Sequence, residues 1–145
     1  MSTPSQRIRA ARERTGLQIG EVAYRCGLSY EHYNDIESYD DDAAQTISLE
    51  ALRRLSRSLG VTALFILEGA DAATPTARIT FAEFAACVAE AVRSSGKDVE
   101  TWGEEAGWDV APLLDDPGEI WGLNGEALRE IAEAAGVDWR AVLPD

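Results

Sequence analysis

Apolar side chains recur along this chain with the three- and four-residue spacing of helices, and no stretch alternates in the manner of a half-buried strand. The clearest stripe follows Ser48, where Leu49, Leu52, Leu55 and Leu59 lie at that spacing. Such a stripe gives a helix one apolar face to bury against its neighbours. The pattern therefore predicts an all-α protein.

Capping residues and glycines set the expected helix ends in the first half. Thr3, Pro4 and Gln6 mark the first start, because threonine caps a helix, proline suits its first turn and glutamine completes a capping box. Ser29 and Ser48 are suited to cap two later helices. The helices expected in this half cover residues 4–15, 18–26, 30–37, 48–59 and 63–67. Residues 38–46, SYDDDAAQT, are expected to form a loop.

The second half begins after a small, polar, proline-containing stretch, residues 70–77, which is expected to be a linker. Thr80 and Glu83 form another capping box. The helices expected after it cover residues 81–95, 98–106, 109–115 and 124–135. Residues 124–145 also repeat residues 48–69, with seven identities in 22 positions. We interpret the chain as a tandem repeat of one five-helix module, in residues 1–69 and 78–145.

The charge of the chain is strongly negative and unevenly divided. Its 145 residues carry 26 aspartates and glutamates against 13 lysines and arginines, a formal net charge of −13. The net charge is −3 in residues 1–77 and −10 in residues 78–145. An acidic second half disfavours contact with phosphate backbones and anionic lipids. A nucleic-acid contact is therefore expected only at the arginines of residues 7–14 and 53–57.

The search for targeting signals and the spacing of the cysteines both bear on the compartment of the protein. No apolar run is long enough for a transmembrane helix, and the first residues lack the apolar segment of a signal peptide. Cys26 and Cys87 match no redox or metal-ligand spacing and are expected to be free thiols in a reducing compartment. We expect a cytoplasmic protein with no membrane partner.

The sequence offers no catalytic constellation. His32, the single histidine, has no cysteine or serine at a nucleophile spacing. The run Asp40–Asp42 lacks the glycine and glutamate of a calcium loop, and the glycines fall at expected helix ends rather than in a phosphate-binding loop. We expect neither an enzyme nor a metal or cofactor site.

A series of apolar, glycine and capping positions agrees in order and spacing with one known family. These positions are Ile8-Arg9-x-x-Arg12, Gly16-Leu17, Glu21-Val22-Ala23, Gly27-Leu28-Ser29, Ile36-Glu37, Leu52-x-x-Leu55 and Leu59-Gly60-Val61. On these residues the segment 6–69 resembles the phage-repressor helix-turn-helix family, also called Cro-like or xenobiotic-response-element (XRE) proteins. The resemblance implies a lambda-repressor-like fold for each module, with the second module a degenerate copy.

The resemblance also implies roles within residues 18–37. Gln18 would open a helix that faces the DNA backbone, although the family usually has a second glutamine where this chain has Ile19. The next helix would be the recognition helix, which enters the major groove. Its contact residues would be Ser29, Tyr30, Glu31, Asn34 and Asp35. Beneath it, Arg12 and Glu37 would form a buried ion pair.

Phosphate contacts would fall to arginines near that helix. The candidates are Arg7, Arg14, Arg53 and Arg54, together with Arg25 and Arg57. However, Glu31 and Asp35 place two carboxylates on the recognition helix, and Asp40–Asp42 follow it. A carboxylate accepts a hydrogen bond from cytosine and Asn34 suits adenine, but acids beside a phosphate backbone oppose binding.

Two functions therefore stay open. In the first, a DNA-binding transcription regulator uses the N-terminal module on DNA, and the C-terminal module serves packing, homodimerisation or partner sensing. In the second, an acidic protein of the immunity, antitoxin or nucleic-acid-mimic kind binds a basic protein through the same surface. That surface would consist of Tyr30, Glu31, Tyr33, Asp35, Tyr39 and Asp40–Asp42.

All four tryptophans lie in the second half. They are Trp102, Trp108, Trp121 and Trp139. Tryptophans at helical spacing are expected in the core. Trp108 and Trp121 lie near expected loops and are alternatively candidates to anchor an interface, where tryptophan is enriched.

Overall fold

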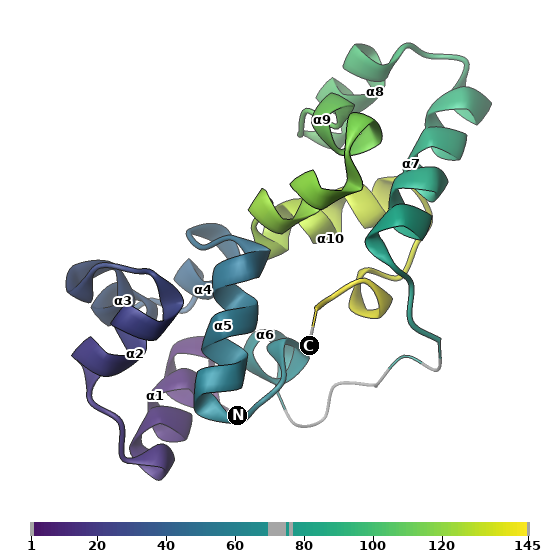
Figure 1. Ribbon diagram of the computed structural model, residues 1–145. Coiled ribbons are helices and arrows are strands. Elements are labelled where there is room, and N and C mark those ends of the chain that lie inside the picture. Colours follow the sequence, from purple (N-terminus) through teal and green to yellow (C-terminus); the bar gives the residue numbers. More distant parts are fainter. Residues whose placement is uncertain (1, 70–74, 76, 145) are drawn as a thin grey trace. The chain divides into compact units, whose positions relative to one another are not determined.

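The computed structural model describes residues 2–69, 75 and 77–144, and this part of the chain is all-α, as predicted (Figure 1). The chain divides into two compact units, Met1–Ala73 with Leu143–Asp145, and Thr74–Val142. We call them the N-terminal and the C-terminal unit. The expected linker, residues 70–77, lies for the most part outside the described residues.

Helices of the N-terminal unit begin and end close to the expected positions. They are α1 (Pro4–Thr15), α2 (Ile19–Cys26), α3 (Tyr30–Ile36), α4 (Asp42–Gln45), α5 (Leu49–Leu59) and α6 (Ala63–Glu68). Thr3 caps α1 in the predicted capping box with Gln6. Ser29 and Ser48 accept hydrogen bonds from backbone N–H groups in the first turns of α3 and α5. Local side-chain chemistry therefore sets these boundaries.

The expectation of a loop over residues 38–46 is wrong in part, because α4 lies within it. This single helical turn buries Ala43, whose exposed fraction is 1%. Four residues are too few to display a helical repeat of apolar positions, so the pattern gave no sign of α4.

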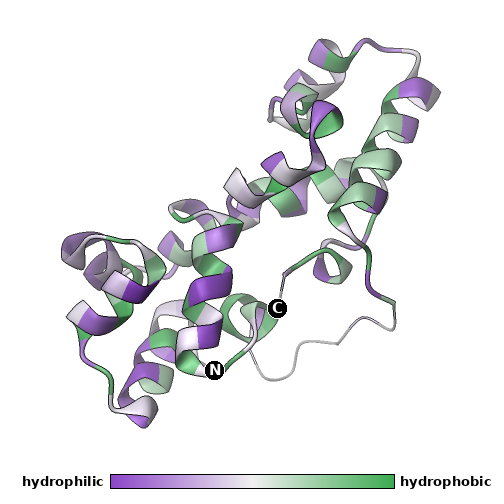
Figure 2. Ribbon diagram, viewed as in Figure 1, coloured by the Kyte–Doolittle hydropathy of each residue, from purple (hydrophilic) through white to green (hydrophobic). Residues whose placement is uncertain are grey.

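The core of the N-terminal unit forms where α2 packs on α3 and α5, and where α1 packs on α5 and α6. The buried residues of this unit are mainly apolar, with Arg7 and Glu37 as its buried charged residues. Figure 2 shows hydrophobic and hydrophilic residues alternating along the ribbons of these helices. The largest fully buried side chains here are Ile8, Tyr33, Ile36, Leu49, Leu52, Leu55, Leu59 and Ile66. The four leucines of the predicted stripe on α5 are thus all core residues.

The C-terminal unit contains shorter helices and two 3-10 turns. They are α7 (Phe81–Ser95), α8 (Val99–Ala106), α9 (Ala111–Asp115), η1 (Pro117–Gly122), α10 (Gly125–Ala134) and η2 (Trp139–Ala141). The sequence did not predict η1, and the fifth helix that the repeat implied in this half, at the positions matching residues 63–67, is the short 3-10 turn η2. The helix expected from residue 109 begins at Ala111, because Val110 is fully buried at the cap position and the carboxylate of Asp109 accepts from the Ala111 N–H at 3.1 Å.

In the C-terminal unit, α7 packs against α8, α9, η1 and α10. The buried residues of the unit include Phe84, Val88, Val110, Leu113, Ile120, Leu128 and Ile131. Trp102 and Trp139 are also buried, as expected for core tryptophans. Trp108 and Trp121 are half-buried, and the Trp121 ring meets Phe81 edge to face with centroids 4.8 Å apart. In the described part of the chain, no helix is long and apolar enough to cross a membrane.

Candidate macromolecule-binding surface on the N-terminal unit

A tight glycine turn joins α2 to α3. Gly27 has a φ of +73°, a left-handed conformation that side-chain-bearing residues rarely adopt. Its N–H donates to the Tyr24 carbonyl at 3.1 Å, and the Leu28 N–H donates to Ala23 at 2.9 Å. Ser29 then caps α3 by accepting from the His32 N–H at 3.0 Å. The chain therefore changes direction within three residues and presents α3 beside α2.

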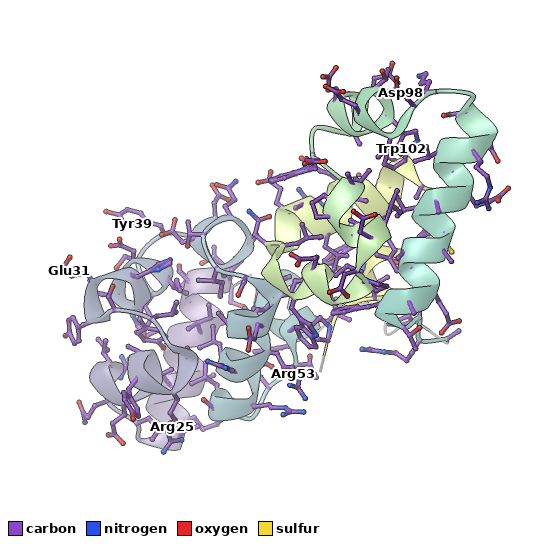
Figure 3. All side chains as sticks on the ribbon, turned by 45° about the horizontal axis from the view of Figure 1, so that its top comes forward. Arg25, Glu31, Tyr39, Arg53, Asp98 and Trp102 are labelled. Atoms are coloured by element: carbon purple, nitrogen blue, oxygen red, sulfur yellow. The ribbon has the colours of Figure 1, made fainter. Side chains whose placement is uncertain are left out.

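One face of α3 is polar and exposed. Tyr30, Glu31, Asn34 and Asp35 all lie on it, and the exposed fraction of Tyr30 is 59%. Figure 3 shows the Glu31 side chain extending outward from the unit. The opposite face carries Tyr33, which is fully buried. Tyr33 therefore belongs to the core, and its expected place on a protein-binding surface is wrong.

Arg12 and Glu37 form the ion pair that the family resemblance implied. Arg12 donates from Nε to Glu37 Oε2 at 2.6 Å and from Nη2 to Oε1 at 3.0 Å. The Glu37 side chain is only 1% exposed and the Arg12 side chain 14%. The hydrogen bond to Glu37 raises the pKa of Arg12. Such a two-point contact fixes geometry as well as charge, and it links α1 to the end of α3.

A second arginine also contacts Glu37. Arg9 Nε lies 3.6 Å from Glu37 Oε1, and Arg9 Nη2 donates to the Glu37 carbonyl at 3.1 Å. Arg9 is about half exposed, so it contributes less than Arg12 to neutralising the buried carboxylate. Glu37 is thus held by two side chains from successive turns of α1.

Buried titratable groups lie behind this ion pair. Burial, together with the neighbouring Glu37 carboxylate, raises the pKa of Tyr33 far above its usual value. The Tyr33 hydroxyl has no hydrogen-bond partner among the described residues. Burial also raises the pKa of the free Cys26 thiol to about 11. Tyr33 and Cys26 are both buried, so these two groups support α3 from beneath.

Arg7 was expected to contact phosphate, and the structure corrects this. Its exposed fraction is 7%, and both Nε and Nη2 donate to the Ile66 carbonyl, at 3.2 and 2.9 Å. Its Nη1 donates to the Ser2 carbonyl. Desolvation on burial lowers the pKa of Arg7. Arg7 therefore connects α1 to α6, and it is not available to a ligand.

The other candidate arginines differ in their availability. Arg14 and Arg25 are exposed, as is Arg57. Arg54 donates to Glu50 one helical turn away at 3.0 Å, and Arg53 is half-buried. In Figure 3 the labelled Arg25 and Arg53 lie on a different side of the unit from Glu31 and Tyr39. Arg25 and Arg53 thus lie away from the acidic side of the unit, which bears Glu31.

The acidic side continues beyond α3. Asp40 accepts a hydrogen bond from the Ser5 hydroxyl at 2.6 Å, which lowers the pKa of its carboxyl group. Asp41 is exposed, and Asp42 begins α4. Tyr39, between α3 and these acids, is 60% exposed.

Tyr24 was not predicted as a surface residue from the sequence, and it is 86% exposed on α2. Val22, Ala23 and Cys26 are the buried residues of that helix. A tyrosine at a position that the helical period assigns to solvent was the available signal. Gln18, at the start of α2, is exposed as expected of a surface residue, and its N–H donates to Glu21 at 3.3 Å.

The single histidine has a structural contact. His32 Nε2 lies 2.9 Å from the Thr46 hydroxyl, which connects α3 to the residue that follows α4. Within the described residues no three histidine, cysteine or carboxylate side chains gather in a way that suits a metal ion.

Comparison with known proteins adds no family. No family model matches the chain, and searches of characterised proteins and of solved structures give no match. The surface of α2 and α3 is therefore the basis from which a function is inferred.

Proposed function

We propose that the chain is a DNA-binding regulator of the Cro-like helix-turn-helix class, in which α3 enters the major groove. One observation carries the proposal: α3 follows a glycine turn, exposes its whole polar face and is anchored from beneath by Arg12 and Glu37. A helix held in this way can fit a major groove about 12 Å wide without losing its own packing.

Base contacts fall to three side chains of α3 in this proposal. Asn34 suits adenine, which offers one donor and one acceptor at its major-groove edge. Glu31 and Asp35 suit the amino group of cytosine. Arg14, Arg25 and Arg57, which are exposed, take the place of the buried Arg7 as phosphate contacts.

The proposal includes a tandem repeat, with the C-terminal unit as a version that has lost the DNA-contacting residues. Gly27 and Gly107 both end a second helix in the left-handed conformation. Ser48 and Asn124, at matching positions of the repeat, both cap the helix that follows. Thr3 and Thr80 both form capping boxes at the first helix. The C-terminal unit then serves packing, dimerisation or partner sensing.

The test is binding to a pool of genomic DNA fragments, followed by sequencing of the retained DNA. We expect retention at about 50 mM salt and a steep loss toward 200 mM, as for any contact made through phosphates. Arg25→Ala should reduce the slope of log affinity against log salt by about 1, and Asn34→Ala should relax sequence preference without that change. Arg129→Ala, an exposed arginine of the C-terminal unit, is the control. No retention at low salt would refute the proposal.

A second candidate function is supported by the exposed tyrosines. Tyr24, Tyr30 and Tyr39 are 59–86% exposed, although tyrosine side chains carry large apolar area, and Glu31 and Asp40 lie in the same part of the chain. Tyrosines among acidic residues suit the surface of a protein that binds a basic partner.

The double variant Glu31→Gln/Asp35→Asn distinguishes the two functions. If α3 contacts DNA, removing two negative charges strengthens non-specific DNA binding, because repulsion from phosphates is lost. If the same face binds a basic protein, the change slows association and weakens the complex. The same two substitutions are thus expected to strengthen binding to DNA in the first case and to weaken binding to a basic protein in the second. Measuring both affinities therefore distinguishes the two functions.

A further inference from the structure

The outer side of α2 carries exposed residues that the core of the unit does not use. They lie within one helical turn of one another, and we call them the α2 face: Gly20, Glu21, Tyr24 and Arg25. Tyr24 is 86% exposed, more than Tyr30 or Tyr39. A tyrosine ring has a large apolar area, and tyrosine is enriched at protein interfaces. A ring that lies so far in solvent therefore points to a partner surface.

Helix α3 extends the α2 face with a second aromatic ring. A Cβ built on Gly20 would lie 4.0 Å from Cδ2 of Tyr30, so the Tyr30 ring lies beside the first turn of α2. Tyr30 is itself 59% exposed. Because Gly20 has no side chain, the backbone of another helix can approach α2 closely at this position. Two exposed rings and a point of close approach thus occur on one surface.

The α2 face also carries one charge of each sign. Glu21 and Arg25 are one helical turn apart, a spacing at which an acid and a base can pair on a helix. Among the described residues, however, neither takes part in an ion pair. Glu21 accepts the Gln18 N–H at 3.3 Å through Oε1. Both charges are therefore available to a partner that presents the opposite pair.

A second copy of the chain presents that pair. A two-fold axis that crosses the α2 face midway between Glu21 and Arg25 makes the two copies of α2 antiparallel, and it places each Glu21 opposite the Arg25 of the other copy. Two-fold dimers use one self-complementary surface in this way, so that every contact forms twice. Repulsion between copies is also weaker here, because the net charge is −3 in residues 1–77 and −10 in residues 78–145.

We propose that the α2 face, together with Tyr30, binds a second copy of this chain in a two-fold symmetric dimer. The Tyr24 rings supply the apolar contact, and the two Glu21–Arg25 contacts fix the register of the helices. The dimer covers α2 and the start of α3, so it competes with DNA for this surface. Only that competition rests on the proposed function, since Arg25 contacts Glu21 in the dimer and phosphate in the DNA complex.

The experiment is sedimentation equilibrium of the full-length protein without DNA, from about 10 µM to about 1 mM, where interfaces below the standard size associate. We expect a monomer–dimer equilibrium. Arg25→Glu places like charges at both contacts and should weaken the dimer at least about tenfold. Arg129→Glu makes the same change of charge at an exposed arginine of the C-terminal unit and should alter the dissociation constant less than about twofold.

The charge-swapped variant Glu21→Arg/Arg25→Glu tests the pairing itself. Each copy again presents one acid and one base, so the dissociation constant should return to within about threefold of that of the unaltered chain. Circular dichroism checks that the swapped chain folds, because Glu21 also accepts a hydrogen bond at the start of α2. A folded swapped variant that stays monomeric would overturn the inference.

Two measurements test the surface without a change of charge. Tyr24→Ser should weaken the dimer by about tenfold, whereas Tyr39→Ser, at a tyrosine that is 60% exposed beyond α3, should not. In the unaltered chain, dilution should shift the amide NMR resonances of residues 20–30 more than any others. A chain that stays monomeric at about 1 mM, or dilution shifts confined to other residues, would overturn the inference. Neither result bears on the retention of DNA, which tests the proposed function separately.

Discussion

The two units place different helices after the same kind of turn. Gly27 and Gly107 each end a helix with a positive φ, and α3 or α9 follows within a few residues. Helix α3 has seven residues and exposes a polar face, whereas α9 has five and buries Leu113 against the core of its unit. The turn alone does not determine whether the next helix is displayed. The residues that follow the turn decide it.

The contacts that hold α3 and α9 to the rest of their units differ as well. The end of α3 is held by a charged pair, because Arg12 reaches Glu37 from α1. Helix α9 is held by apolar contacts, since it packs on α7, and the 3-10 turn η1 that follows also packs there. A displayed polar helix needs an anchor below its end, and a helix that buries its own side chain does not.

Removing the charged anchor should have the largest effect. We expect Arg12→Ala to lower the free energy of unfolding by about 3–5 kcal/mol, because Glu37 would keep a buried charge with only the half-exposed Arg9 nearby. Arg14→Ala, an exposed arginine of the same helix, should change it by less than about 0.5 kcal/mol. Urea unfolding followed by circular dichroism measures both. Equal effects would mean that α3 is not anchored by charge.

Removing the apolar anchor of α9 should come next. Leu113 is 2% exposed, so Leu113→Ala should cost about 2–4 kcal/mol through lost burial and a residual cavity. Leu114→Ala, at a half-buried neighbour, should cost clearly less. Tryptophan fluorescence reports on this unit, because all four tryptophans lie in it. A similar cost at both leucines would contradict a specific role for Leu113.

The two cysteines, one in each unit, allow the effect of burial on thiol reactivity to be compared directly. At pH 8 the pKa of about 11 lowers the thiolate fraction of Cys26 by about a hundredfold relative to an unperturbed thiol, and burial restricts access further. Cys87 is exposed. We expect a disulfide reagent to modify one thiol per chain rapidly, and none in Cys87→Ser until denaturant is added. Rapid modification of Cys87→Ser would show that the region beneath α3 opens readily.

The smallest effect concerns the acidic side of the N-terminal unit. The Ser5 hydroxyl lowers the pKa of Asp40, so this carboxylate stabilises the fold above its ordinary pKa of 3.8, and the contribution disappears as pH falls through the lower value of the folded state. The melting temperature of Asp40→Asn should therefore lie slightly below that of the unaltered protein at pH 7. Near pH 2 the two melting temperatures should be the same. Asp41→Asn is the control. A difference between Asp40→Asn and the unaltered protein that persists in strong acid would exclude this cause.

Sequence alone predicted the parts of the fold that local chemistry dictates. Thr3, Ser29 and Ser48 cap helices as expected, and the leucine stripe of α5 is buried. The short elements α4 and η1 were not predicted, because one or two turns contain too few residues for a repeating pattern of apolar positions.

The candidate site could be predicted only in part, for a related reason. The polar face of α3 follows from its period, and the pairing of Arg12 with Glu37 came from the family resemblance. The burial of Arg7 depends on the Ile66 carbonyl, 59 residues away, and no local pattern records such a contact. Tyr33 and Tyr24 are the same residue type on adjacent helices, yet Tyr33 is buried and Tyr24 is 86% exposed. The helical period of α2 assigns Tyr24 to solvent, whereas the burial of Tyr33 depends on how α3 packs in the core.

The double contact of Glu37 also has a consequence for motion. A helix of seven residues does not persist alone in water. Because Arg9 and Arg12 tie its end to α1 across 28 and 25 positions, α3 cannot detach without breaking contacts of α1. In hydrogen exchange, the amides of α3 should therefore open together with those of α1, as one cooperative unit and not by fraying from the exposed face. A ligand that contacts only α3 would then slow exchange in α1 as well.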